Sequence, residues 1–256
     1  MTTMIKFNPL DYELVNADYC LICGERGNFY SSVDRYGIKQ RSMFCRCGHV
    51  WLSPRMSEAG YAEFYEHHYR PLVSEFHGRE INAQTIQDGQ TGYATSIINF
   101  MSYNIGQSLR VLDIGGSTGV VVKQFAWRQP NKSQDVTVLD PCQTELDEAA
   151  KLGLNTIHGT LSTTEIEGPF DLITICQTID HMLDPHADLD RCRNLLSEDG
   201  HIFVDFLDFE RTKEIKIDHP HNFNFQNACR LMAIYFQVIK FERSGNHMRF
   251  LGKRHA

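Results

Sequence analysis

The stretch Arg110-Val111-Leu112-Asp113-Ile114-Gly115-Gly116-Ser117-Thr118-Gly119 decides the fold that we expect for this chain. Three apolar side chains, at 111, 112 and 114, are followed by glycines, which is the pattern of a short buried strand that runs into a tight turn. Glycine lets the backbone approach a ligand closely, and residues 120–127 continue as a helix whose positive end faces the turn. The stretch therefore predicts a nucleotide-like ligand at the end of a strand.

A glycine-rich turn alone does not identify that ligand, because NAD- and FAD-binding folds place G-x-G-x-x-G at the same position. Here the spacing is D-x-G-x-x-x-G, with Asp113 two residues before the first glycine. A carboxylate at this strand end would repel a pyrophosphate, but it suits the cationic amino-acid end of a ligand. This difference favours S-adenosylmethionine (SAM) over a dinucleotide.

The stretch resembles motif I of the class I SAM-dependent methyltransferases, which is usually written with a middle glycine where this chain has Ser117. The resemblance implies an α/β fold with a Rossmann-like, seven-stranded sheet. It also implies that the carboxylate and the turn together bind the methionine end of SAM. The residues concerned are Asp113, Gly115, Gly116, Ser117 and Gly119.

The composition is that of an ordinary soluble globular protein, with 256 residues of which 42% are hydrophobic and 22% charged. No apolar run approaches the ~18 residues of a transmembrane helix, and the first residues lack the apolar core of a signal peptide. We therefore expect a cytoplasmic protein with no membrane contact. The formal net charge of -7 argues against a general affinity for nucleic acid, which needs clustered Lys and Arg.

Two cysteine pairs precede motif I, Cys20-Leu21-Ile22-Cys23-Gly24 and Cys45-Arg46-Cys47-Gly48-His49. C-x-x-C-G places two thiolates on one tight turn, and the glycine lets the backbone amides point at the sulfurs. The second turn is less regular, so two ligand sets are open: all four cysteines, which we favour, or His49 in place of one of them. Either set predicts a closed, structural zinc knuckle; the alternative is free thiols in a surface loop.

The segment between the knuckle and motif I is expected to be largely helical. Aromatic residues at 61, 64, 65 and 68/69 fall on one helix face, and we expect their rings to pack the zinc module against the main domain rather than to form a platform for the substrate. Residues 70–90 are polar and predict a mobile flap or a helix start, and Gln84–Tyr103 predicts a helix that covers the sheet. We therefore divide the chain into a zinc-knuckle module with its linker (1–60), a helical cap (61–105) and a SAM-binding domain (106–256).

After motif I, strand and helix patterns alternate as a doubly wound sheet requires. We expect strands at 135–139, 154–161, 170–176, 202–208, 236–241 and 247–251. Asp140 ends the second strand, where it either accepts hydrogen bonds from both ribose hydroxyls or caps the next helix, and Pro141 would lie near the adenine. The crevice of an open parallel sheet lies at the carboxyl ends of its central strands, so Gln177 and the loop 177–185 should face the methyl group.

Histidines near this crevice are the candidates for a general base. His181 comes first, because an imidazole with a pKa near 6.5 accepts a proton at neutral pH; the alternative is a packed ring in a helix cap. His219 and His221 flank a proline, so we expect them in a loop that reaches the acceptor pocket, unless they are surface residues. A polar or cationic substrate is expected to contact the carboxylates that follow the fifth strand, namely Asp205, Asp208 and Glu210.

The order of these parts resembles the methyltransferases of sugar and natural-product pathways, notably the nucleotide-sugar C-methyltransferases. The shared features are the cysteine knuckle, C-G-H-V-W-L-S-P-R at 47–55, F-Y-x-x-x-Y at 64–69 and motif I. The resemblance implies methyl transfer from SAM to a carbon or oxygen of a small polar molecule, either a sugar or nucleotide-linked. Three rival hypotheses are an RNA methyltransferase with a zinc knuckle, a non-catalytic SAM-binding scaffold and a dehydrogenase. The oligomeric state is not predicted.

Overall fold

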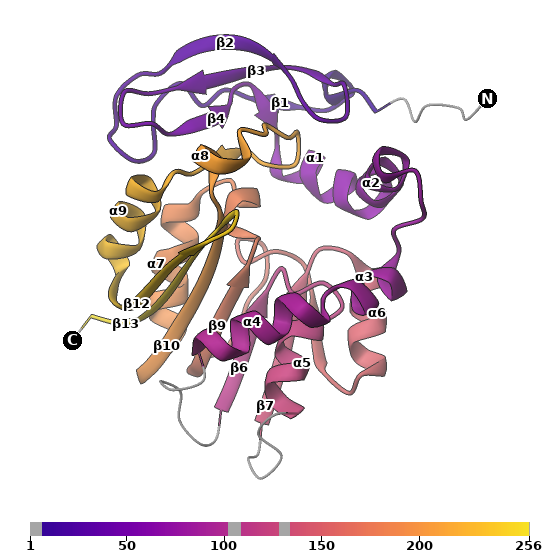
Figure 1. The fold of residues 1–256 in the computed structure, drawn as a ribbon, viewed down its shortest axis with the longest axis vertical. Coiled ribbons are helices and arrows are strands. Elements are labelled where there is room, and N and C mark those ends of the chain that lie inside the picture. The colour runs from indigo at the N-terminus through magenta and orange to yellow at the C-terminus, as the bar shows by residue number, and fades with distance from the viewer. Residues whose placement is uncertain (1–6, 102–108, 128–133, 256) are drawn as a thin grey trace.

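A seven-stranded sheet forms the centre of the structure (Figure 1). The computed structural model describes residues 7–101, 109–127 and 134–255. The strands are ordered β12-β13-β10-β9-β6-β7-β8; the last five of these pair in parallel, and β13 pairs antiparallel with both of its neighbours, β10 and β12. This confirms the predicted α/β fold. The strand bounds are β6 (Leu109–Ile114), β7 (Gln134–Asp140), β8 (Asn155–His158), β9 (Phe170–Cys176), β10 (Leu196–Leu207), β12 (Phe236–Ser244) and β13 (His247–Arg254).

Helices cover both faces of this sheet, which is why its central strands are apolar on both sides. One face packs against α4 (Thr91–Met101), α5 (Val120–Trp127) and α6 (Gln143–Lys151). The other face packs against α7 (Pro185–Leu195) and α9 (Phe225–Tyr235). None of the helices within the described ranges is long and apolar enough to cross a membrane.

A smaller antiparallel sheet lies beyond the carboxyl ends of the parallel strands (Figure 1). It contains β2 (Asn28–Val33), β3 (Lys39–Phe44), β4 (Val50–Leu52) and β11 (His221–Asn222), in the order β11-β4-β3-β2. β11 comes from the segment that follows β10, and it pairs His221 with Trp51 and Asn222 with Val50. The N-terminal sheet therefore incorporates a strand from the C-terminal part of the chain. Beside it, β1 (Leu14–Val15) pairs with β5 (Arg55–Met56), and short helical turns lie at Pro9–Asp11, Ile179–His181 and, as α8, at Phe209–Thr212.

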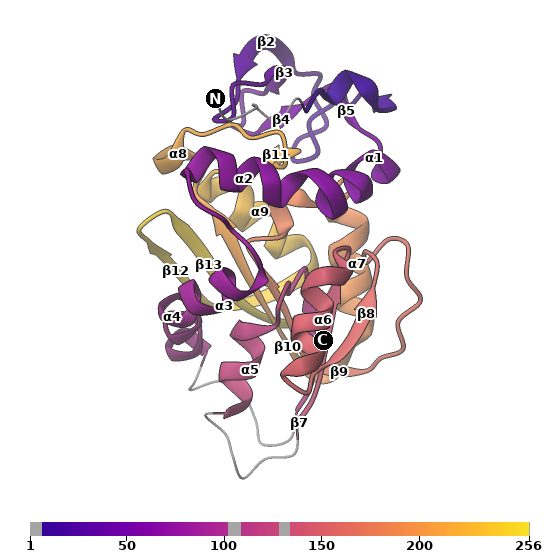
Figure 2. The same cartoon turned by 90° about the vertical axis from the view of Figure 1, so that its right-hand side faces the viewer.

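The first helices of the cap, α1 (Glu58–Glu63) and α2 (Tyr69–His77), lie between the two sheets, whereas its last helix, α4, covers the large sheet (Figure 2). α1 continues through a π-helical turn at Phe64–His68 into α2. The predicted single helix Gln84–Tyr103 is instead two helices, α3 (Ala83–Gly89) and α4, which meet at Gln90. The break follows from Gly89 and Gly92 on either side of Gln90, because glycine is a poor helix former. Residues 70–77 and 83–89 are helical rather than a flap, while Tyr103 and the predicted 105/106 boundary lie outside the described residues.

The turn after β6 requires left-handed backbone at three positions, Gly115 (φ 65°), Ser117 (φ 53°) and Gly119 (φ 71°). A Cβ on Gly115 would lie 2.3 Å from Thr178 Cγ2, and one on Gly119 would lie 2.4 Å from Leu154 Cδ1. Ser117 occupies the place of the middle glycine of motif I and keeps the conformation that glycine would adopt there. The departure from the motif is thus a change of side chain without a change of backbone.

We expect Ser117→Gly to raise the free energy of unfolding by about 1 kcal/mol. A non-glycine residue in the left-handed region costs about 1–3 kcal/mol, and the greater backbone entropy of glycine in the unfolded chain offsets about 0.5–1 kcal/mol of the gain. Urea unfolding measures the difference. The control is Ser31→Gly at an exposed position of β2, which should lower the free energy by about 0.5–1 kcal/mol. An equal loss of unfolding free energy in both variants would contradict the prediction.

Candidate active site

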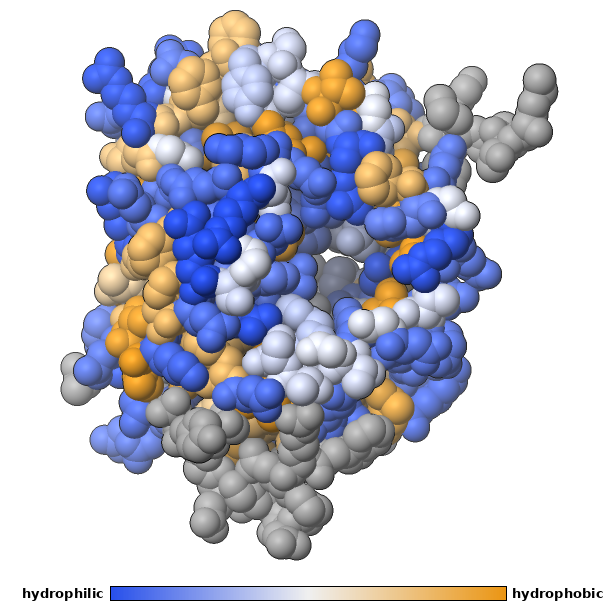
Figure 3. Space-filling view, viewed as in Figure 1, coloured by the Kyte–Doolittle hydropathy of each residue, from blue (hydrophilic) through white to orange (hydrophobic). Residues whose placement is uncertain are grey.

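A cavity of about 420 Å³ lies at the carboxyl ends of the parallel strands. Its walls come from the glycine turn, residues 139–142, the loop 177–184 and the helices α1, α2 and α4 of the cap. The face seen in Figure 3 is hollowed between the N-terminal layer and the helices that cover the sheet. This volume lies within the usual range of small-molecule sites, and the location is that of the ligand crevice in open parallel sheets.

Asp113 lies at the floor of the cavity, with a side chain that is almost fully buried. Its Oδ1 accepts a hydrogen bond of 2.6 Å from Thr174 Oγ1. Its Oδ2 lies 2.3 Å from where a Cβ on Gly116 would stand, so the missing side chain of Gly116 makes room for the carboxylate. Burial, with a smaller contribution from Asp140, raises the pKa of Asp113 to about 7. A cation bound beside it would compensate the buried charge.

Asp140 joins the glycine turn to the turn that follows β7. Its Oδ2 accepts from the Ser117 backbone N–H and its Oδ1 from the Cys142 backbone N–H, both at 2.9 Å. The N-cap of α6 is Cys142, so Asp140 is not the cap residue. Burial and the neighbouring Glu145 raise the pKa of Asp140 to about 7. Each carboxylate oxygen keeps a further lone pair for a ligand hydroxyl, and Pro141 lines the same part of the cavity.

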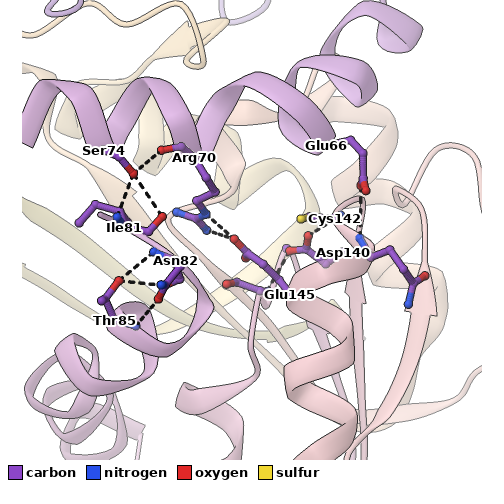
Figure 4. A network of polar contacts seen from close by, with 12 residues as sticks. Glu66, Arg70, Ser74, Ile81, Asn82, Thr85, Asp140, Cys142 and Glu145 are labelled. Carbon is purple, nitrogen blue, oxygen red and sulfur yellow. Dashed lines mark hydrogen bonds and ion pairs between the residues drawn. The ribbon is translucent and has the colours of Figure 1, made fainter. Parts of the chain in front are cut away.

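Polar contacts fasten the cap over this end of the cavity (Figure 4). Arg70 of α2 forms an ion pair and a hydrogen bond with Glu145 of α6, and Glu66 accepts from the Gln143 backbone N–H at 3.3 Å. Glu145 is 4% exposed, so the pair is shielded from water and little screened. The contacts hold α2 above the turns that carry the two aspartates.

Gln177 is left-handed (φ 53°) where β9 ends, and it lines the cavity. Its backbone N–H donates to the Asp205 carbonyl oxygen at 3.0 Å. The next residue, Thr178, donates from its hydroxyl to the Gly115 carbonyl oxygen at 3.3 Å. Strained backbone of this kind is concentrated at functional sites. The hydrogen bond of Thr178 connects the loop 177–185 to the glycine turn.

His181, His219, Tyr65 and Lys216 meet at the other end of the cavity. His181 Nδ1 lies 2.5 Å from Tyr65 Oη, which also donates to the Asp218 carbonyl oxygen at 3.1 Å. Since that carbonyl can only accept, His181 Nδ1–H donates to Tyr65 and the lone pair of His181 is on Nε2. Burial first, and Lys216 second, lower the pKa of His181 to about 3, so the ring is neutral at neutral pH.

The same corner contains a group of side chains that could hold a metal ion. Donor atoms of His181, Asp218 and His219 lie within 4.8 Å of one another. The charge of Lys216 lowers the pKa of both imidazoles after the larger effect of burial. A metal ion at this position would be repelled by the ammonium group of Lys216 but attracted by the Asp218 carboxyl group, so the charges of this corner do not by themselves select a cation or an anion.

Four residues expected near the substrate lie elsewhere. His221 is 3% exposed and does not line the cavity; it lies on β11, between the two sheets. The expected substrate contacts of Asp205, Asp208 and Glu210 are wrong for this cavity, which none of them lines. Their carboxylates already have partners: Asp205 accepts from Tyr93 Oη at 2.6 Å, and Asp208 and Glu210 both pair with Arg243.

For the tyrosines of the cap, contact with a ligand is only the second interpretation of the aromatic spacing. The expectation that the aromatic rings only pack the modules together holds for Phe64, which is fully buried. Tyr61, Tyr65 and Tyr69 instead line the cavity. Their spacing of four residues places them on one face of α1 and α2. Three hydroxyl groups on an otherwise apolar face were the signal that could have identified them.

The four knuckle cysteines come together at the edge of the small sheet. All four sulfurs lie within 4.8 Å of one another, with Cys20–Cys47 at 3.5 Å and Cys23–Cys45 at 3.2 Å. A zinc tetrahedron with Zn–S bonds of about 2.3 Å has S–S edges of about 3.8 Å, so the arrangement fits. His49 Nδ1 lies 3.5 Å from Cys20 Sγ, where it can donate to a sulfur that binds metal.

A sequence-family model described as "Methyltransferase domain" matches residues 86–251. This match covers more than half of the chain, so the protein belongs to the methyltransferase-domain family. It is therefore an enzyme that transfers methyl groups. No curated protein matches the sequence.

Solved structures of methyltransferases share the fold. The 1,6-didemethyltoxoflavin-N1-methyltransferase of Burkholderia thailandensis is 15% identical, with a TM-score of 0.57 over 84% of this chain and 99% of that chain. A SAM-dependent methyltransferase of Clostridium acetobutylicum is 15% identical, with a TM-score of 0.52 over 77% and 99%. The Haloferax volcanii complex of the Trm112 activator with a methyltransferase includes a chain that is 12% identical, with a TM-score of 0.56 over 68% and 94%. At these identities the likeness concerns the fold.

The buried carboxyl groups predict that the stability of the ligand-free protein falls between pH 6.5 and 8. Burial raises the pKa of Asp113, Asp140 and Asp180 to about 7, 7 and 8. The folded state therefore keeps protons that the unfolded chain, with aspartate pKa values near 3.9, has released. The buried histidines, whose pKa values are lowered, act in the opposite direction as the imidazoles of the unfolded chain titrate around pH 6.5, so the slope of the carboxyl groups is measured most cleanly above pH 7.

Urea unfolding at several pH values between 6.5 and 8 measures this slope, which is at most about 1.4 kcal/mol per pH unit for each carboxyl group. Asp180→Asn should reduce the slope, because an amide still accepts from the Leu207 backbone N–H but does not titrate. Asp199→Asn, at an exposed residue, is the matched control. The prediction is wrong if Asp180→Asn leaves the slope unchanged.

Proposed function

We propose that the enzyme transfers a methyl group from SAM to a small polar acceptor, either a sugar or a nucleotide-linked molecule. The observation that carries the proposal is the buried Asp113 carboxylate, which lies against the bare backbone of Gly116 and faces the cavity, with no ion pair to a cationic side chain in the part of the chain that the structure describes. The methionine end of SAM has an ammonium group that would compensate this charge. Asp140, with a free lone pair on each oxygen, would accept from the ribose hydroxyls.

The donor and acceptor ends of the cavity differ in charge, and the difference supports the acceptor class. The donor end contains Asp113, Asp140 and the paired Glu145. At the other end, Lys216 lines the cavity and forms no ion pair within 4.0 Å among the described residues. The carboxyl groups of Asp218, Glu214 and Asp180 are near enough to act on the pKa of Lys216 but form no direct ion pair with it, so the ammonium group keeps donors for a phosphate or another anionic group of the acceptor.

SAM supplies a methyl group on a sulfonium, which is displaced in line by the acceptor atom. The residues of the chain hold the two molecules in that line, which contributes several kcal/mol through orientation. Gln177 and His181 border the transfer path, and the Nε2 lone pair of His181 faces the proton of the acceptor. Because burial and Lys216 lower the pKa of this imidazole to about 3, it becomes an effective base only when the negative charge of a bound acceptor raises that pKa. The imidazolium that forms would still donate from Nδ1 to Tyr65 Oη. His219 is a second base in the same corner.

Transfer from radiolabelled SAM tests this function. Incubated with a cell extract, the enzyme should place label in acid-soluble metabolites and not in precipitable RNA or protein. Asp113→Asn should lower the transfer about 10–100-fold, because a charged hydrogen-bonding group worth about 1.5–3 kcal/mol is lost. The amide oxygen still accepts from Thr174, so the fold is retained. Asp147→Asn, at an exposed position of α6, is the matched control. Label in RNA or protein would overturn the acceptor class, and no binding of SAM would overturn the reaction.

We also propose that the four cysteines bind one structural zinc ion. Elemental analysis should find one zinc per chain, and chelation should lower the thermal midpoint by about 5 °C or more, which is roughly 2 kcal/mol for a chain of this size. Cys45→Ser should reduce the zinc content, whereas Cys229→Ser, at a half-buried thiol outside the cluster, should not. If Cys47→Ser retains zinc and His49→Ala loses it, the fourth ligand is His49.

A further inference from the structure

Two buried histidines connect the knuckle to the C-terminal part of the chain. His49, fully buried, follows the second cysteine turn, and His221, 3% exposed, lies on β11. His49 Nε2 and His221 Nδ1 are 3.3 Å apart. Their ring planes differ by 16° and their centroids are 5.3 Å apart, so the rings meet edge to edge as an in-plane hydrogen bond requires. At its other nitrogen, His49 contacts Cys20 Sγ.

Arg55 continues this connection to the loop 177–185. Its Nη1 lies 2.7 Å from His221 Nε2, and its Nη2 donates to the Leu183 carbonyl oxygen at 2.7 Å. Leu183 lines the cavity two residues after His181. A continuous path of four side chains therefore runs from a knuckle sulfur to the backbone of the acceptor-side loop.

The proton positions along this path follow from its two ends. Arg55 can only donate, so His221 Nε2 accepts and His221 Nδ1–H donates to His49 Nε2. The proton of His49 is then on Nδ1 and is donated to Cys20 Sγ, which as a metal-bound thiolate only accepts. Each contact has one donor and one acceptor, and both rings are neutral. The Leu183 carbonyl oxygen, 3.3 Å from His221 Nε2, takes its hydrogen bond from Arg55.

We infer that Cys20, His49, His221 and Arg55 form a hydrogen-bonded chain through which the metal cluster positions the loop at Leu183. His49 and His221 are positioning residues for the acceptor side of the active site and touch no substrate themselves. The inference rests on the proposed zinc site. Removing one member of a buried chain leaves the next donor or acceptor without a partner, so the effect reaches both ends.

The knuckle end is tested by competition for zinc with a chelator of known affinity. His49→Phe keeps an aromatic ring on Trp51, with which His49 stacks, but loses both nitrogens. We expect zinc affinity to fall about 10–100-fold, the usual effect of removing a residue that hydrogen-bonds to a metal ligand. His49→Asn retains a donor near the position of Nδ1 and should bind zinc as the wild type does. Equal affinity in all three proteins would overturn this half of the inference.

The loop end is tested by hydrogen exchange of the backbone amides of residues 181–184 in the zinc-loaded proteins. His49→Phe and His49→Asn should both speed this exchange at least about 10-fold, because neither accepts from His221 as His49 does. Arg55→Lys should also speed it while leaving zinc affinity unchanged, which tests the loop end even if a His49 variant folds poorly.

His186→Phe is the matched control for a general loosening of the interface. His186 of α7 also joins the knuckle to the main domain, because it contacts the Leu21 carbonyl oxygen on the knuckle and the Tyr235 hydroxyl at the end of α9. It lies outside the chain of hydrogen bonds. It should leave the exchange of residues 181–184 unchanged. Equal acceleration by His186→Phe, or none by Arg55→Lys, would overturn the inference. Neither measurement depends on methyl transfer, so a failure of this inference can be told apart from a failure of the proposed reaction.

Discussion

The left-handed turn after β6 is the constraint on which the cavity depends. It brings the backbone N–H of Ser117 to the Asp140 carboxylate and leaves bare backbone at Gly116 for the Asp113 carboxylate. Both acids are thereby buried at the ends of neighbouring parallel strands, where their charge is costly without a partner. A cationic, hydroxylated ligand relieves that cost, so the binding preference of the floor follows from the conformation of one turn.

The acceptor side depends on segments that are distant in the sequence. Tyr65 of the cap contacts His181, 116 residues later, and the Asp218 carbonyl oxygen, 153 residues later. β11 then places the same C-terminal segment in the N-terminal sheet. The cap and the loop after β9 therefore form one wall of the cavity, and the small sheet contacts the C-terminal segment through β11 without lining the cavity itself.

The distribution of charge gives the cavity a direction. Asp113, Asp140 and Glu145 gather where the donor is expected, and the ammonium group of Lys216 with two neutral imidazoles lies where the acceptor is expected. The carboxyl groups of Asp180 and Asp218, whose pKa values are raised by burial, lie near the same ammonium group. A net charge of -7 is thus no guide to the local charge on the acceptor side.

Local patterns were sufficient to predict the sheet, its seven strands and the glycine turn, because alternating apolar segments and glycine positions need no distant contact. The two short cysteine turns likewise predicted that four thiols come together. Long-range contacts place Tyr65 and Lys216 at the cavity, His221 against His49 and Arg55, and the carboxylates of Asp205 and Asp208 on other partners. These outcomes depend on contacts between residues more than 30 positions apart, and no sequence period specifies which distant side chains meet.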